Sequence, residues 1–178
     1  MIYDVFVNCD FYGVNILTNK ARKRTKLLLE VCFIIYIILL FYFLFFSDKF
    51  GRTTSRQDYS YNIIPFHEIT RFIKYREIIG VESFMVNIAG NIFAFCPFGF
   101  LLPVLNNKKR GILYVTLVSF EFSLFIELIQ LITRVGSYDI DDIILNTIGG
   151  ILGYIIYRIC YFIWKRRFVK HGVSKEKR

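Results

Sequence analysis

Three carboxylate residues lie within 16 positions of one another in the second half of a largely apolar chain. Glu127, Asp139 and Asp142 could transfer protons, hold a divalent cation or hydrogen-bond a ligand. The sequence has no G-x-S-x-G or Walker A motif, and the segment from His67 to Arg71 breaks the zinc pattern H-E-x-x-H at its last position. We therefore favour binding over catalysis, and we expect no cofactor and no bound metal.

The composition is typical of a membrane protein rather than a soluble one. The chain has 178 residues, of which 55% are hydrophobic and 19% aromatic. This length allows roughly one domain, and so small a globule cannot bury that much Phe, Ile and Leu. A net charge of +9 could indicate nucleic-acid binding. The basic residues, however, lie between long apolar runs, which is a membrane pattern, and we expect no nucleic-acid partner.

Four apolar stretches are long enough to cross a bilayer as helices, which takes about 20 residues each. They cover residues 27–46, 84–105, 112–132 and 143–164. The sequence therefore predicts an all-α integral membrane bundle of four transmembrane helices.

Basic residues cluster in three segments that alternate with these spans. Five precede the first span within 20–26, three fill 108–110, and seven lie in 165–178. Because basic segments stay on the cytoplasmic side, we place all three there, and both termini are then cytoplasmic. The chain divides into a basic tail over 1–26, a transmembrane domain over 27–164 and a second basic tail over 165–178.

The connection between the first two spans, residues 47–83, contains another helical pattern. Apolar residues recur near helical spacing and charged residues occupy the other face, which predicts a short amphipathic helix. Such a helix either lies in the membrane interface or covers the bundle, and both possibilities stay open. The apolar positions are Phe66, Ile69, Phe72, Ile73 and Ile79, and the charged ones are Glu68, Arg71, Lys74 and Glu77.

Polar residues inside the spans form helical stripes at a common depth. With the orientation above, these stripes all lie in the outer half of the membrane, where lipid offers no hydrogen-bond partner. Polar residues that arose independently would lie at different depths and on different sides of their helices. We therefore predict one outward-facing polar cluster that binds a ligand. Interhelical hydrogen bonding alone is the structural alternative. The polar cluster comprises Asn87, Asn91, Glu127, Gln130, Arg134, Asp139, Asp142 and Asn146.

Further expectations concern the neighbours of these stripes. Arg134 is seven residues from Glu127, and we predict that it offsets the Glu127 charge. Asp141 lies on another side of its helix and is expected to point away from the polar cluster. Small residues predict close packing of the second and fourth spans, through Gly90 and Ala94 on one and Gly149, Gly150 and Gly153 on the other.

Four stretches in order resemble the VanZ-like family of bacterial membrane proteins. They are Asn-Ile-Ile-Pro-Phe at 62–66, Asn-Ile-Phe-Ala-Phe-Cys-Pro-Phe-Gly at 91–99, Glu-Leu-Ile-Gln at 127–130 and the acidic, glycine-ending run at 139–150. The positions that match the family pattern are Asn91, Pro97, Gly99, Glu127, Gln130, Asp139, Asp142, Asn146 and Gly149.

The resemblance implies a bacterial plasma-membrane protein, and the Ile-, Lys- and Phe-rich composition indicates a Gram-positive cell. The family is named for a protein associated with resistance to the glycopeptide antibiotic teicoplanin, so it implies a role in how glycopeptides meet their envelope target. It implies no particular reaction. We expect membrane lipid as a partner, with a lipid-linked cell-wall precursor or a glycopeptide as the ligand. The alternatives are a membrane enzyme acting on a lipid-linked substrate and a structural subunit of a membrane complex.

Overall fold

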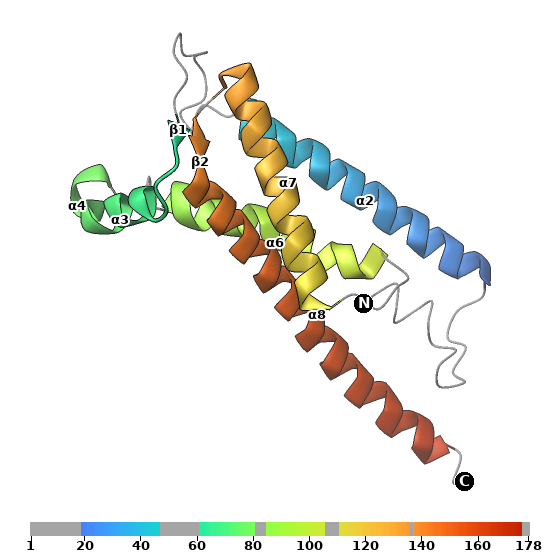
Figure 1. Ribbon diagram of the computed structural model, residues 1–178. Helices are drawn as coiled ribbons and strands as arrows, with labels where there is room; N and C mark the ends of the chain where they lie inside the picture. The colour runs from blue at the N-terminus through green and yellow to red at the C-terminus, as the bar shows by residue number, and fades with distance from the viewer. Residues whose placement is uncertain (1–18, 47–60, 81–84, 106–110, 136, 176–178) are drawn as a thin grey trace.

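The computed structural model describes residues 19–46, 61–80, 85–105, 111–135 and 137–175, and helices make up most of these residues (Figure 1). Four of the helices are long and apolar enough to cross a membrane. The four candidate spans are formed by α2 (Asn19–Phe46), by α6 (Gly90–Leu105) together with the residues from Asn87 that precede it, by α7 (Ile112–Thr133) and by α8 (Ile140–Lys175). The predicted all-α bundle with four candidate membrane spans is confirmed.

The helix ends differ from the apolar stretches that predicted them. α2 begins at Asn19 and α8 runs to Lys175, so the basic segments next to the first and fourth spans continue the same helices. Lys and Arg are good helix formers, so a helix need not end where its apolar run ends. The second span begins with a single π-helical segment, η3 (Met85–Ala89), before α6.

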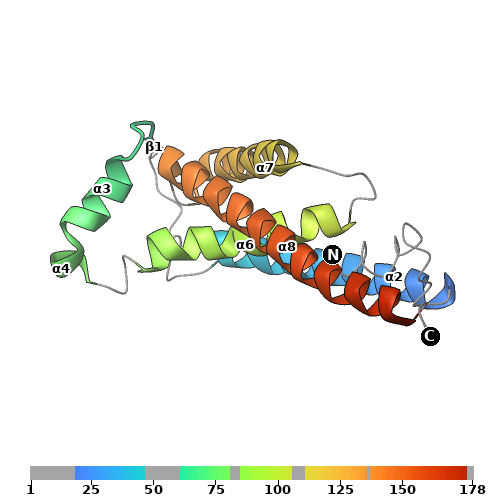
Figure 2. The same ribbon diagram turned by 90° about the horizontal axis from the view of Figure 1, so that it is seen from below.

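The most extensive contact in the bundle joins α6 and α8, which cross closely in Figures 1 and 2. A Cβ atom added at Gly99 would collide with the backbone of Gly150, and one added at Gly153 would collide with the carbonyl oxygen of Cys96. One added at Gly149 would meet the carbonyl oxygen of Ile92. Glycine is therefore what lets the two backbones touch, as at other small-residue contacts between membrane helices.

The other two long helices pack around this pair. α7 lies against α8, where Val115 is buried in an apolar cluster with Tyr154 and Tyr157. α2 lies at the side of the bundle and has many exposed apolar residues. It is joined to α6 by the Tyr36 hydroxyl, which donates to the carbonyl oxygen of Ala94 at 2.6 Å.

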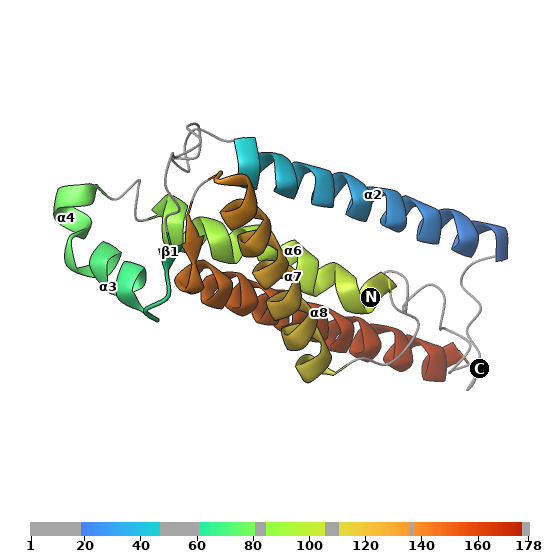
Figure 3. The ribbon, with the colours of Figure 1, turned by 45° about the horizontal axis from the view of Figure 1, so that its top comes forward.

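A two-stranded parallel sheet links the first connection to the start of α8. β1 (Tyr61–Asn62) pairs with β2 (Tyr138–Asp139), and Asn62 stands opposite Asp139. The short helices α3 (His67–Lys74) and α4 (Arg76–Ile79) follow β1. Together they lie at the end of the bundle where α6 and α8 begin (Figure 3).

The amphipathic helix predicted in this connection is present but interrupted. Tyr75 forms the C-cap of α3 with a non-helical ψ of 17°, and α4 begins after it. Phe66 precedes the helix in a left-handed conformation with φ of 63°, so it does not share the helical face of Ile69 and Phe72.

Candidate functional site

Two amides of the polar cluster connect neighbouring helices in the interior of the bundle. The Asn91 side chain of α6 donates to the Asp142 carboxylate of α8 at 2.5 Å. The Asn146 amide, one turn further along α8, donates to the hydroxyl of Ser123 on α7 at 2.9 Å. Asn91 and Asn146 are buried, whereas Asp142 is half-buried. These contacts fix the relative rotation of α6, α7 and α8.

Glu127 joins α7 to the start of α8. Its buried carboxylate accepts the backbone N–H of Asp139 at 3.0 Å. Asp139 directly precedes α8, and the N–H groups at the beginning of a helix lack helical acceptors. A negative charge near a helix N-terminus is also favoured by the helix dipole. Glu127 therefore supplies both an acceptor and a favourable charge at this helix end.

Gln130 makes the corresponding contact with the end of α2. Its side-chain amide donates to the carbonyl oxygen of Leu44 at 3.1 Å. Leu44 lies in the last turn of α2, where carbonyl groups have no helical donor. Because an apolar membrane interior provides no other partner, this bond ties α2 to α7 at that end.

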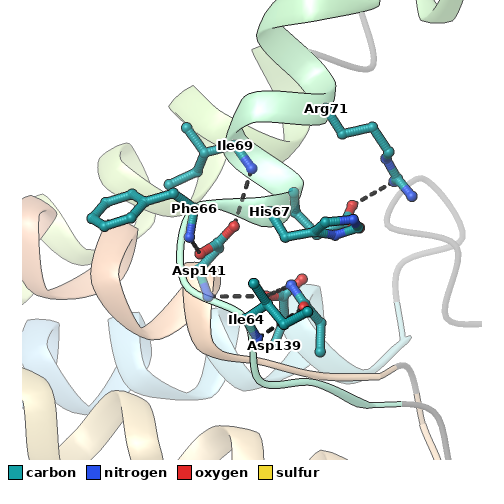
Figure 4. A network of polar contacts seen from close by, with 9 residues as sticks. Ile64, Phe66, His67, Ile69, Arg71, Asp139 and Asp141 are labelled. Carbon is teal, nitrogen blue, oxygen red and sulfur yellow. Dashed lines mark hydrogen bonds and ion pairs between the residues drawn. The ribbon is translucent and has the colours of Figure 1, made fainter.

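Three residues around β1 and β2 form a network that continues into α3 (Figure 4). The Asp139 carboxylate accepts the Asn62 side-chain amide at 3.1 Å and the backbone N–H of Asp141 at 2.9 Å. The buried Asp141 carboxylate in turn accepts the backbone N–H groups of Phe66 at 2.5 Å and Ile69 at 3.1 Å. Asp141 thereby caps the N-terminus of α3.

Burial raises the pKa of the Asp139 carboxyl above its ordinary value. Hydrogen bonds from Asp141 and Asn62 oppose this shift, while the negative charges of Asp141 and Glu68 add to it. Asp139 is therefore a carboxylate whose charge is disfavoured by its surroundings, at the edge of the polar cluster.

The last two members of the polar cluster lie at its margins. Asn87 is half-buried in η3. Arg134 is exposed and lies outside the helical stripe, because α7 ends at Thr133. The N–H groups of Arg134 and Val135 turn back to the carbonyls of Leu131 and Gln130, and Arg134 adopts the left-handed conformation typical of such helix ends. The proposed charge compensation of Glu127 by Arg134 stays a prediction.

The structure assigns a larger part to Asp141 and Asn62 than sequence reasoning gave them. Asp141 does lie off the stripe that holds Asp142 and Asn146, but it is buried and bonded to α3. An acid in the first turn is favoured by the dipole of its own helix, so the place of Asp141 in α8 gave no signal of its contact with α3. Periodicity could not identify a partner 75 residues away.

The polar cluster is acceptor-rich and mostly enclosed. Three buried oxygens have no hydrogen-bond partner within the described part of the chain: Ser119 Oγ, Gln130 Oε1 and Asn146 Oδ1. Two carboxylates of the polar cluster, those of Asp139 and Asp142, are half-buried. In the ranges described, no three His, Cys, Asp or Glu side chains are grouped so that they could hold a metal ion.

Comparison with known proteins places this arrangement in a family. The sequence model of the VanZ/LLP1 family matches residues 33–161, which include every residue of the polar cluster and leave out the basic ends. The chain belongs to the VanZ/LLP1 family. It is 32% identical over 134 residues to Protein VanZ of Enterococcus faecium, and the match covers 74% of each protein. No solved structure matches this VanZ-like chain.

Proposed function

We propose that this VanZ/LLP1 protein lowers the susceptibility of its cell to glycopeptide antibiotics such as teicoplanin. Membership of the family and the similarity to Protein VanZ over most of both chains support this function. We further propose that both termini are cytoplasmic, so that the polar cluster faces the outside, where glycopeptides meet the cell envelope.

The polar cluster is the part of the molecule that we propose to act on an envelope lipid or on the antibiotic itself. The observation that carries this proposal is the pair of half-buried carboxylates, Asp139 and Asp142. Within the described residues, the buried amides of Gln130 and Asn146 each also keep an oxygen that has no hydrogen-bond partner. Glycopeptides and lipid-linked cell-wall precursors both present amide N–H and sugar hydroxyl groups. Such donors are complementary to carboxylate and amide oxygens, and their hydrogen bonds strengthen where water is excluded.

The test is the teicoplanin susceptibility of cells that express the wild type or conservative variants at equal membrane abundance. Asp142→Asn keeps an oxygen that can accept from Asn91, and Glu127→Gln keeps an acceptor for the Asp139 N–H. Both variants remove a carboxylate charge with little change in shape. Glu121→Gln on the exposed side of α7 is the matched control. We expect the wild type and the control to lower susceptibility and the two cluster variants to lose the effect.

Other results would redirect the assignment. If the cluster variants disappear from the membrane, or if they protect cells as well as the wild type does, the polar cluster only holds helices together. If the wild type leaves susceptibility unchanged, the proposed function is wrong. Binding and catalysis are separated by incubating the purified protein with teicoplanin or a lipid-linked precursor and analysing both by mass spectrometry. An unchanged but bound ligand supports binding, and a covalently altered one supports an enzyme.

A further inference from the structure

The unit formed by β1, α3 and α4 exposes a large apolar surface. Phe72 is the buried residue among the side chains described between 61 and 80. Ile78 is 82% exposed, and several neighbours are more than half exposed. These neighbours are Tyr61, Ile63, Ile64, Phe66 and Ile73. The apolar residues of this connection therefore do not serve mainly to cover the bundle, which was one of the two possibilities that the sequence left open.

The unit of β1, α3 and α4 is attached to the beginning of α8. Asp141 caps α3 from the first turn of α8, and β1 pairs with the residues that directly precede α8. The candidate membrane segment of α8 begins at Ile140. In Figure 2, α3 runs steeply across the direction of α6 and α8, at the end where those helices begin. If α8 crosses the membrane from Ile140, a helix in this position would lie across the membrane normal at the boundary of the hydrocarbon layer.

The two sides of α3 differ in chemistry. Ile73 is exposed and Ile69 half-buried, and helical spacing places both on the side opposite Arg71, with Lys74 between the two sides. The Lys74 ammonium lies 5.5 Å from the centre of the Tyr75 ring, and both side chains are exposed. Arg71 pairs with Glu68, which leaves Lys74 as the cation of α3 that is available to an anion. An apolar side, an aromatic ring and a cation are the chemical groups that suit the acyl, interfacial and phosphate layers of a lipid leaflet.

We propose that α3 and α4 form a phospholipid-binding surface that inserts its apolar side into the outer leaflet and brings Lys74 to the headgroup phosphates. The surface continues the lipid-facing exterior of the spans, where apolar side chains such as Phe93 are also exposed. Attraction between Lys74 and anionic headgroups adds to the apolar insertion. Insertion into lipid does not depend on the proposed action of the polar cluster on antibiotics and stands if that proposal fails. The assignment to the outer leaflet rests on the proposed cytoplasmic position of both termini.

The test measures how deep single tryptophans lie when the full-length protein is embedded in lipid nanodiscs. The native Trp164 is first replaced by Phe, and Ile78→Trp or Ile73→Trp then reports on the apolar side. Glu77→Trp is the matched control, because it neighbours Ile78 and is also exposed. The discs contain phosphatidylcholine with brominated acyl chains, with or without phosphatidylglycerol. Circular dichroism and size-exclusion chromatography identify folded variants.

We expect bromine to quench the emission of Ile78→Trp and Ile73→Trp strongly and that of Glu77→Trp weakly. Phosphatidylglycerol should deepen the quenching at Ile78→Trp, and Lys74→Glu should abolish that increase without changing the quenching in phosphatidylcholine. If folded Ile78→Trp and Ile73→Trp are no more quenched than the control, the surface does not insert and the proposal is overturned in favour of a protein partner. If Lys74→Glu changes nothing, the headgroup contact is overturned.

Discussion

Asp141 and Phe66 are 75 residues apart, yet the carboxylate of the first accepts the backbone N–H of the second. Phe66 stands at the N-cap of α3 and provides no side-chain cap of its own. The missing cap is therefore supplied by another helix. This relationship makes the position of α3 depend on the first turn of α8.

Removing this cap should release α3 from the bundle. Asp141→Ala leaves two backbone N–H groups without their acceptor, and loss of a helix cap typically costs about 0.5–2 kcal/mol. We expect faster tryptic cleavage at Arg71 and Lys74 in the solubilised protein, with the helical circular dichroism of the long helices retained. Asp141→Asn keeps one acceptor oxygen, so its rate of cleavage should lie between that of the wild type and that of Asp141→Ala. Equal cleavage of Asp141→Ala and wild type would show that β1 and β2 alone hold the unit.

Glu127 and Glu121 provide a matched comparison, because both are carboxylates on α7. Glu127 is 1% exposed and bonded to the Asp139 N–H, whereas Glu121 is exposed. A buried donor left without its acceptor costs about 1–3 kcal/mol. We expect Glu127→Leu to lower the thermal denaturation midpoint of the detergent-solubilised protein, and Glu121→Leu to leave it unchanged or raise it. The reverse order would mean that Glu121 makes the more important contact, for example with another subunit.

The close approach of α6 and α8 can be tested with one added methyl group. A Cβ atom at Gly99 would overlap the backbone of Gly150, but one at Gly111 would meet nothing within 4 Å. Overpacking of this kind costs about 1–3 kcal/mol. Gly99→Ala should therefore reduce thermal stability, and Gly111→Ala should not. A stable Gly99→Ala protein would show that the two helices can move apart at little cost.

Stability should depend on pH through Asp139. Since its pKa is raised in the folded protein, the folded state holds this proton more tightly than the unfolded state. The contribution of Asp139 to the free energy of unfolding therefore falls as pH rises from the ordinary aspartate pKa of about 3.9 through the raised value. Asp139→Asn keeps an acceptor for Asn62 and cannot become charged.

We expect the denaturation midpoint of Asp139→Asn, minus that of the wild type, to increase as pH rises from about 4 to about 7. The comparison of the two midpoints at each pH isolates the part of the pH dependence that requires the Asp139 carboxyl. A difference that does not change with pH would show that the proton on Asp139 is not linked to folding.

The proposed orientation can be checked by labelling single cysteines in a background that lacks the native ones. Glu77 on α4 and Lys165 on α8 both have exposed side chains. With both termini cytoplasmic, a membrane-impermeant maleimide should label Glu77→Cys in intact cells and Lys165→Cys only after permeabilisation. The opposite pattern would place the polar cluster on the cytoplasmic side.

The sequence by itself determined the four long helices and their apolar character, because length and hydropathy are local properties. It also showed which polar residues and glycines of one helix share a face, because this follows from helical periodicity. The basic segments illustrate the limit of this reasoning. Hydropathy located the apolar stretches 27–46 and 143–164, but it did not show that α2 begins earlier, at Asn19, or that α8 continues to Lys175.

Only the tertiary structure decided which groups face one another. The residue of α6 opposite Gly150 is Gly99, the amide of Gln130 reaches the last turn of α2, and Asp141 caps α3. Each pairing depends on the relative rotation and register of two helices, which are set by the packing of the whole bundle. A periodic pattern defines the face of one helix and contains no information about its neighbour, so these contacts could not be predicted from spacing alone.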